Sequence, residues 1–214
     1  MSVSLQKGQK VNLSKEHAGL AKVIVGLGWD EAKPSGGGGL FGALFGSSSH
    51  QAIDCDASAI MLKNGKFTAR ALDDRLGVYI IMEAIKRAKE LGCKVGVYGA
   101  STTGEETTKT GAFWTSTRIN PTLAIVVDVT YTSDCSGMNP AEMGTVLLGG
   151  GPVLCNSPIV VKTLNAKMEE CAKKVGIPVQ REAASRLSYT DGDKIHFSNQ
   201  GVPMVLVSIP LRYM

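Results

Sequence analysis

The feature that most constrains the fold is a nearly continuous apolar run from Thr122 to Val129. A run of this length with many β-branched residues is typical of a strand that lies buried in a parallel sheet. An acid, Asp128, stands close to the carboxyl end of the run. A carboxylate in such a strand is expected to be partly buried and therefore to need a partner.

Residues 67–214 alternate between helical and strand patterns, which predicts an α/β fold with a parallel or mixed sheet. We expect a three-layer unit, in which helices cover both faces of the sheet. Helices are predicted over Leu76–Leu91, Thr107–Arg118 and Pro158–Val175, strands over Lys94–Ser101, Thr122–Val129, Thr145–Leu148, Val179–Ala183 and Met204–Ile209, and a loop or short helix over residues 192–199.

Residues 1–66 follow a different pattern and are predicted to form a small β-rich segment. Val11–Leu13, Lys22–Leu27 and Ala57–Leu62 are strand-like. Asn64-Gly65 directly after the last of these is a strong signal for a hairpin turn. The glycine- and serine-rich stretch 34–49 is predicted to be a flexible loop. We therefore place a domain boundary between residues 66 and 67.

Composition narrows the function classes. The net charge is only +4 and the basic residues are scattered, so nucleic-acid binding is not expected. No apolar stretch is long enough for a membrane span. The five cysteines are odd in number and form no Cys-x-x-Cys pair, which predicts reduced thiols and a cytoplasmic protein. The oligomeric state is not readable from the sequence.

Acidic residues gather at the ends of three successive predicted elements. Asp73-Asp74 precede a helix, Glu105-Glu106 follow a strand, and Asp128 stands near the end of another strand. An open α/β sheet places its site at the carboxyl ends of its strands, where acids repel one another unless a cation joins them. The pattern predicts a metal site with one spare carboxylate as general base. The alternatives are a helix cap at Asp73-Asp74 and an exposed turn at Glu105-Glu106.

Residues 67–214 also resemble the catalytic domain of the glutamyl-aminopeptidase and tetrahedral-aminopeptidase family of di-metal peptidases. The matching stretches are Ala71-Leu72-Asp73-Asp74-Arg75-Leu76-Gly77, Thr103-Gly104-Glu105-Glu106, Val127-Asp128-Val129-Thr130, Gly149-Gly150-Gly151-Pro152, Thr190-Asp191-Gly192 and Pro210-Leu211-Arg212-Tyr213-Met214. The resemblance implies a metallopeptidase-like α/β domain that hydrolyses a peptide substrate.

The resemblance also implies a role for each acid. Asp73 would bridge two metal ions, and Asp74 would follow it through an unusual peptide bond and support the site. Glu105 would be the catalytic general base, Glu106 would bind one metal ion, and Asp128 would bind the other. Zinc, cobalt or manganese would be the ions.

The family's site includes two histidines that this chain is expected to lack. One would stand in an earlier segment, and the other would directly follow Met214. The histidines present are His17, His50 and His196. The remaining ligands are all oxygen atoms, which suit magnesium, calcium or manganese better than zinc. We therefore expect weak metal binding and impaired peptidase activity.

Residues 1–66 resemble the amino-terminal part of the TerD tellurium-resistance family. The matching stretches are Val3-Ser4-Leu5-Gln6-Lys7-Gly8-Gln9-Lys10-Val11, Val25-Gly26-Leu27-Gly28-Trp29-Asp30 and Asp54-Cys55-Asp56-Ala57-Ser58. That resemblance implies a calcium-binding β-sandwich, with Asp54, Asp56 and Asp30 as candidate ligands. The alternative is that Asp54 and Asp56 are outward-facing strand residues.

The chain therefore looks like a fusion of two incomplete domains. Three functions follow from this organisation: a metal-dependent aminopeptidase-like hydrolase with impaired activity, a calcium-binding stress-response or tellurium-resistance-type protein, and a catalytically silent chimera. The missing histidines favour the silent chimera over an active enzyme, and the extent of the peptidase resemblance favours the peptidase ancestry.

Overall fold

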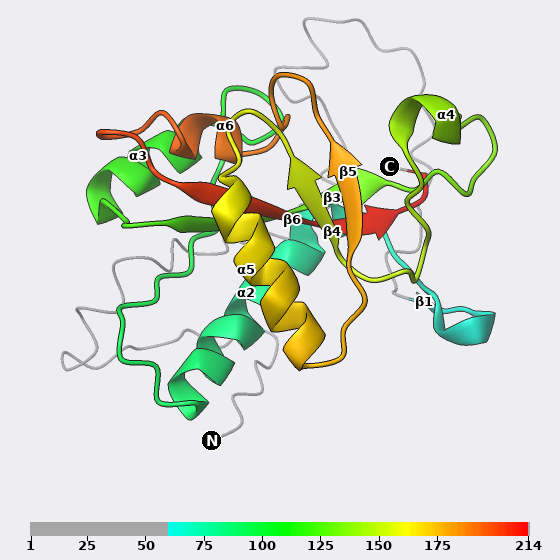
Figure 1. The fold of residues 1–214 in the computed structure, drawn as a ribbon, viewed down its shortest axis with the longest axis horizontal. Helices are drawn as coiled ribbons and strands as arrows, with labels where there is room; N and C mark the ends of the chain where they lie inside the picture. Colours follow the sequence, from blue (N-terminus) through cyan, green and yellow to red (C-terminus); the bar gives the residue numbers. More distant parts are fainter. Residues whose placement is uncertain (1–59, 214) are drawn as a thin grey trace, which may run out of the picture. The chain divides into compact units, whose positions relative to one another are not determined.

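A computed structural model describes residues 60–213 of the chain (Figure 1). The strands predicted at Val11–Leu13 and Lys22–Leu27 and the loop predicted over residues 34–49 lie outside this range. The described residues fall into two compact units, and the boundary lies between Arg70 and Ala71.

The described part of the first unit is a short hairpin. Strand β1 (Ile60–Met61) pairs antiparallel with β2 (Phe67–Thr68), and a 3₁₀ turn, η3 (Lys63–Gly65), connects them. Gly65 has φ of +68°, a left-handed conformation that glycine adopts without steric cost. The hairpin predicted from Asn64-Gly65 is therefore confirmed.

The second unit is built on a mixed sheet of four strands in the order β3-β6-β4-β5. Strands β3 (Ala124–Tyr131) and β6 (Met204–Leu211) are parallel, as are β4 (Val153–Asn156) and β5 (Gln180–Ala183). The two pairs meet where β4 runs antiparallel to β6. This arrangement confirms an α/β fold with a mixed sheet.

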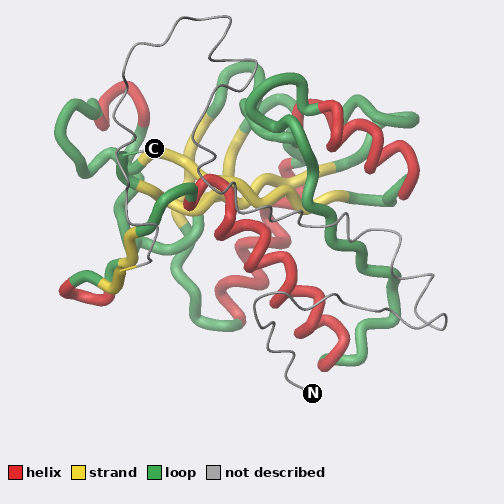
Figure 2. The backbone as a smooth tube through the Cα atoms, turned by 180° about the vertical axis from the view of Figure 1, so that it is seen from behind, coloured by secondary structure: helices red, strands yellow, loops and turns green. Residues whose placement is uncertain are grey.

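Helices pack on this sheet at several points. The helices are α2 (Leu72–Glu90), α3 (Thr110–Ile119), α4 (Pro140–Met143), α5 (Lys162–Lys174) and α6 (Gly192–Ile195). Helix α2 contacts β3, whereas α5 and α6 contact β6, and α3 packs against α6. Figure 1 shows α5 in front of the sheet, and Figure 2, seen from behind, shows α2 in front of it. None of the described helices is long and apolar enough to cross a membrane.

The core lies on one face of the sheet and determines where the acid of β3 is placed. Its buried members are Val126, Cys155, Ile159, Val160, Met204 and Leu206. Val126 is level with Leu206 in the parallel register, and two residues further along Asp128 is level with Ser208. Because side chains alternate along a strand, Asp128 and Ser208 continue the same face, and both are buried.

The strand predicted over Lys94–Ser101 is wrong, because this segment is irregular. A strand needs a hydrogen-bonded neighbour, and the described sheet pairs only β3, β6, β4 and β5. Val95 and Tyr98 are 71% and 59% exposed, so the apolar residues that produced the prediction are not buried.

The strand predicted over Thr145–Leu148 is also wrong. Side chains, and not a neighbouring strand, accept hydrogen bonds from two of its backbone N–H groups. The N–H of Val146 donates to Ser133 Oγ at 2.9 Å, and the N–H of Leu147 donates to Gln180 Oε1 at 2.7 Å. The strand of this region is β4, which begins only after the glycine run and was not predicted.

Strand β3 continues to Tyr131, so Asp128 lies within the strand and not at its end.

The remaining predicted elements are confirmed, with ends that move by no more than about one helical turn. Helices occur at α2, α3 and α5, strands at β3, β5 and β6, and a short helix at α6.

Truncation of the core should show which residues hold this unit together. Met204 is fully buried, so Met204→Ala is expected to lower the free energy of unfolding by about 2–5 kcal/mol, measured by urea denaturation. Leu91, which is 84% exposed, supplies the control: Leu91→Ala should change it by less than about 0.5 kcal/mol. Equal losses in the two variants would contradict this description of the core.

Candidate active site

The first two acids lie at the start of α2, where the backbone is not yet helical. Asp73 has φ −84° and ψ 110°, Asp74 has φ −119° and ψ 52°, and the peptide bond between them is cis. The N–H of Gly77 donates to Asp74 Oδ1 at 2.8 Å. A Cβ atom on Gly77 would lie 2.1 Å from Asp74 Oδ2, so only glycine leaves room for this carboxylate.

Glu105 and Glu106 lie in a tight turn that precedes α3. Gly104 has φ of +73°, and its carbonyl accepts the N–H groups of Thr108 at 3.0 Å and Lys109 at 2.7 Å. The turn explains why α3 begins at Thr110, later than predicted. The side chain of Glu105 is 29% exposed, whereas Glu106 is an exposed residue.

Two further acids come from β3 and from the loop before α6. Asp128 Oδ1 accepts the N–H of Val129 at 2.8 Å. Asp191 Oδ2 accepts a hydrogen bond from Thr102 Oγ1. Asp191 Oδ1 is buried and has no hydrogen-bond partner among the described residues. Such an oxygen is costly to desolvate.

The pKa of Asp128 shows that the acids of different segments share one environment. Burial is the largest cause of a rise to about 7, and the Val129 N–H opposes it. The charges of Asp74, Glu105 and Asp73 raise the pKa further. Since these residues come from α2 and the turn before α3, the fold brings three segments within electrostatic reach of one another.

Asp74 behaves in the same way. Burial raises its pKa to about 6, and the Gly77 N–H opposes the rise. The charges of Asp73, Glu105 and Asp191 add to it. We call the five acids that act on one another in this way, Asp73, Asp74, Glu105, Asp128 and Asp191, the carboxylate cluster.

The pKa values of two other members of the carboxylate cluster, Asp73 and Asp191, are also raised. Burial, followed by the charge of Glu105, raises the pKa of Asp73. Burial also raises the pKa of Asp191, where the Thr102 hydrogen bond and the charge of Lys109 lower it and the charge of Glu105 raises it. All four shifts express the cost of holding like charges together away from water.

The carboxylate cluster does not form a metal centre from the described residues alone. Within residues 60–213, no three His, Cys, Asp or Glu side chains lie close enough together to hold a metal ion. The oxygen donors have the chemistry that a divalent cation prefers, but their geometry does not fit such an ion.

The predicted site residues therefore divide into three groups. Asp73, Asp74, Glu105 and Asp128 are within electrostatic reach of one another. Glu106 is exposed and is not among the charges that shift these acids. The others, Asp30, Asp54, Asp56, His17 and His50, lie outside the described residues.

His196 is the one histidine within the described residues. It lies at the end of α6 with Nδ1 3.3 Å from the carbonyl oxygen of Val202. Its ring packs edge-on against Phe197, with centroids 4.9 Å apart. These contacts place His196 in local packing at the end of α6.

Sequence reasoning missed two members of this site. Asp191 lies within the quoted stretch Thr190-Asp191-Gly192, so its position was marked but its role was not. Lys109 carried no signal beyond its spacing of four residues from Glu105. Its Nζ donates to Glu105 Oε1 at 2.5 Å and to the carbonyl oxygen of Tyr189 at 2.7 Å.

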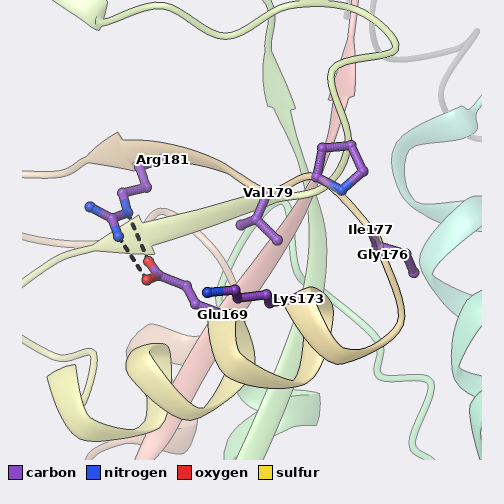
Figure 3. Close-up of a pocket in the computed structure, with 7 residues that line it drawn as sticks. Glu169, Lys173, Gly176, Ile177, Val179 and Arg181 are labelled. Carbon is purple, nitrogen blue, oxygen red and sulfur yellow. Dashed lines mark hydrogen bonds and ion pairs between the residues drawn. The ribbon is translucent and has the colours of Figure 1, made fainter.

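A separate pocket lies where α5 turns toward β5 (Figure 3). Arg181 forms a two-point ion pair with Glu169. Its Nε and Nη2 atoms each donate to a carboxylate oxygen of Glu169 at 2.7 Å. The lining contains no member of the carboxylate cluster, and its charged side chains are Glu169, Lys173 and Arg181. The pocket is therefore not the candidate active site.

Solved structures of aminopeptidases are similar in fold to this chain. The crystal structure of a TET aminopeptidase from a marine sediment archaeon, Thaumarchaeota archaeon, is 33% identical, with a TM-score of 0.65, over 73% of this chain and 45% of the other. An aminopeptidase from Desulfurococcus kamchatkensis is 27% identical, with a TM-score of 0.62, over 74% and 45%.

Curated relatives divide the chain in two. A lysyl aminopeptidase from Pyrococcus furiosus is 33% identical over 156 residues, 72% of this chain and 43% of that protein. The stress response protein SCP2 from Bacillus subtilis is 56% identical over 68 residues, 32% of this chain and 33% of that protein. The chain thus spans less than half the length of these relatives.

Family models agree with this division. The TerD domain matches residues 1–72, and the M42 glutamyl aminopeptidase family matches residues 45–214. Both resemblances read from the sequence are confirmed, as is the fusion-like organisation. The M42 match covers the greater part of the chain, and the described fold lies within it. The chain therefore belongs to the M42 glutamyl aminopeptidase family and carries a TerD domain at its amino-terminal end.

Proposed function

We propose that residues 71–213 carry the carboxylate part of a metal-dependent aminopeptidase site, with a peptide as substrate. The observation that supports this most is the mutual electrostatic influence of Asp73, Asp74, Glu105 and Asp128. Membership of the M42 family supports the reaction class. Its aminopeptidase activity is proposed to be very low or absent, because the described residues do not complete a metal centre.

Within this proposal the acids keep the roles that the family resemblance implies. Glu105 is the general base, Asp73, Glu106 and Asp128 are the metal ligands, and Asp74 supports Asp73. Zinc, cobalt or manganese is the expected ion. It is expected to bind weakly, because the described residues form no group of three ligands and because carboxylates replace the imidazoles that zinc prefers. A general base must lie within reach of the proton that it takes, so the position of Glu105 is the critical one.

A second candidate function is calcium binding by the TerD domain. The identity to SCP2 and the TerD match favour it. Asp30, Asp54 and Asp56 are its proposed ligands, since hard oxygen donors suit calcium. Calorimetric titration with calcium separates this candidate from the first, and a chain that neither binds calcium nor cleaves peptides is the silent chimera.

Hydrolysis of aminoacyl substrates tests the first proposal directly. With zinc, cobalt or manganese added, the full chain should show trace activity or none. Any activity present should fall by about 10²-fold or more in Glu105→Gln, since a general base contributes on this scale. Metal binding, measured by calorimetry, should persist, because Glu105 is the assigned base and not a ligand. Glu90→Gln, at an exposed position on α2, is the control and should behave as the parent chain. Robust hydrolysis that survives Glu105→Gln would contradict the assignment.

The carboxylate cluster should make stability depend on pH. Asp128 and Asp74 have pKa values raised to about 7 and about 6 in the folded protein. The folded state therefore holds protons that the unfolded state releases, so the free energy of unfolding should fall as the pH rises from about 4 to about 7. Thermal unfolding with a chelator present measures this fall.

Substitutions assign the pH effect to the carboxylate cluster. Asp128→Asn removes one titrating group and should flatten the profile between about pH 4 and 7. Glu170→Gln removes an acid whose side chain is 64% exposed on α5, and its profile should follow the parent chain. A profile that is equally steep in the Asp128 variant would show that Asp128 is not held in a shared acidic environment.

A further inference from the structure

Lys109 brings a positive charge into the carboxylate cluster. It lies between the Glu105 turn and α3, with its own carbonyl accepting the N–H of Phe113 at 3.3 Å. Its Nζ lies 2.5 Å from Glu105 Oε1. Its charge also lowers the pKa of Asp191, in opposition to burial and to the charge of Glu105.

Burial distinguishes this ion pair from the other ion pair of four-residue spacing among the described residues. The side chains of Lys109 and Glu105 are 19% and 29% exposed, whereas those of Lys174 and Glu170, also four residues apart, are 68% and 64% exposed. Charges interact more strongly where water is excluded, and loss of one partner then leaves an uncompensated charge. The pair at Lys109 is therefore expected to matter where the exposed pair does not.

The second acceptor of Lys109 is held in place independently. The carbonyl oxygen of Tyr189 lies 2.7 Å from Nζ. The N–H of Tyr189 donates to Asp193 Oδ2 at 2.9 Å, and Asp193 is buried and also accepts the N–H of Ser188 at 2.7 Å. A carboxylate and a fixed carbonyl thus give the ammonium group two oxygen partners from segments far apart in the sequence.

We propose that Lys109 is the internal counter-cation of the carboxylate cluster and that it competes by charge with a divalent ion for these acids. The ammonium group supplies beside Glu105 a positive charge that a metal ion would otherwise bring. Lys109 acts on the carboxylate cluster at two of its members, through its contact with Glu105 and through its charge at Asp191. The inference goes beyond the proposed peptidase function and does not depend on activity.

Replacement of the lysine in the full chain tests this role. Lys109→Met keeps most of the side-chain stem and removes the charge. Its melting temperature, with a chelator present, should fall by about 2–4 °C more than that of Lys174→Met. Its affinity for manganese, titrated as manganese chloride by calorimetry, should rise about tenfold or more, because one repelling unit charge is gone. Lys109→Arg, which keeps the charge, should leave manganese affinity within about twofold of the parent chain.

A double variant separates charge from packing and covers a failure of Lys109→Met to fold. Lys109→Met with Glu105→Gln removes both charges of the pair and should melt above Lys109→Met alone, since no unpaired acid remains. Three results would overturn the proposal: manganese affinity unchanged in Lys109→Met, equal melting temperatures for Lys109→Met and Lys174→Met, or a double variant no more stable than Lys109→Met. Because none of these measurements uses peptide hydrolysis, an inactive chain does not affect them.

Discussion

The parallel register of β3 and β6 is the constraint on which the rest of the described structure depends. It places Val126 beside Leu206 in the core and, two residues on, Asp128 beside Ser208. The same face of the sheet therefore changes from apolar to acidic within one step of the strand period. Helix α2, which packs on β3, brings Asp73 and Asp74 within electrostatic reach of that acid.

Burial of these acids away from water, followed by repulsion among them, is the cost of this arrangement. Backbone N–H groups of Gly77 and Val129 offset part of it, at 2.8 Å each. Thr102 and Lys109 offset a further part at Asp191. The balance remains unfavourable to full ionisation, because the pKa values of Asp74 and Asp128 stay raised. A nearby positive charge stabilises the ionised form of such acids. Either the proposed metal ion or the ammonium group of Lys109 would supply that charge.

Much of the fold could be predicted from local patterns, since β3, β6 and α2 follow their apolar periodicity. The segment 94–101 has the pattern of a strand but no neighbour in the described sheet, and pairing is not written in a local pattern. Strand β4 was missed because it is short and follows a glycine run. Asp73, Asp74 and Glu105 were predictable from their places beside helices, and Asp128 as an acid in an apolar run. Lys109 acts through a contact with Tyr189, 80 residues away, that no spacing reveals.

The central claim is that acids from separate segments share one electrostatic environment. Titration of the Asp128 carboxyl by carbon-13 NMR, in metal-free full-length protein and in Asp74→Asn, tests it most directly. The account predicts a pKa of about 7 for Asp128 in the parent chain and a lower value once the charge of Asp74 is removed. A pKa near the ordinary value of about 3.9, unchanged by Asp74→Asn, would contradict the account.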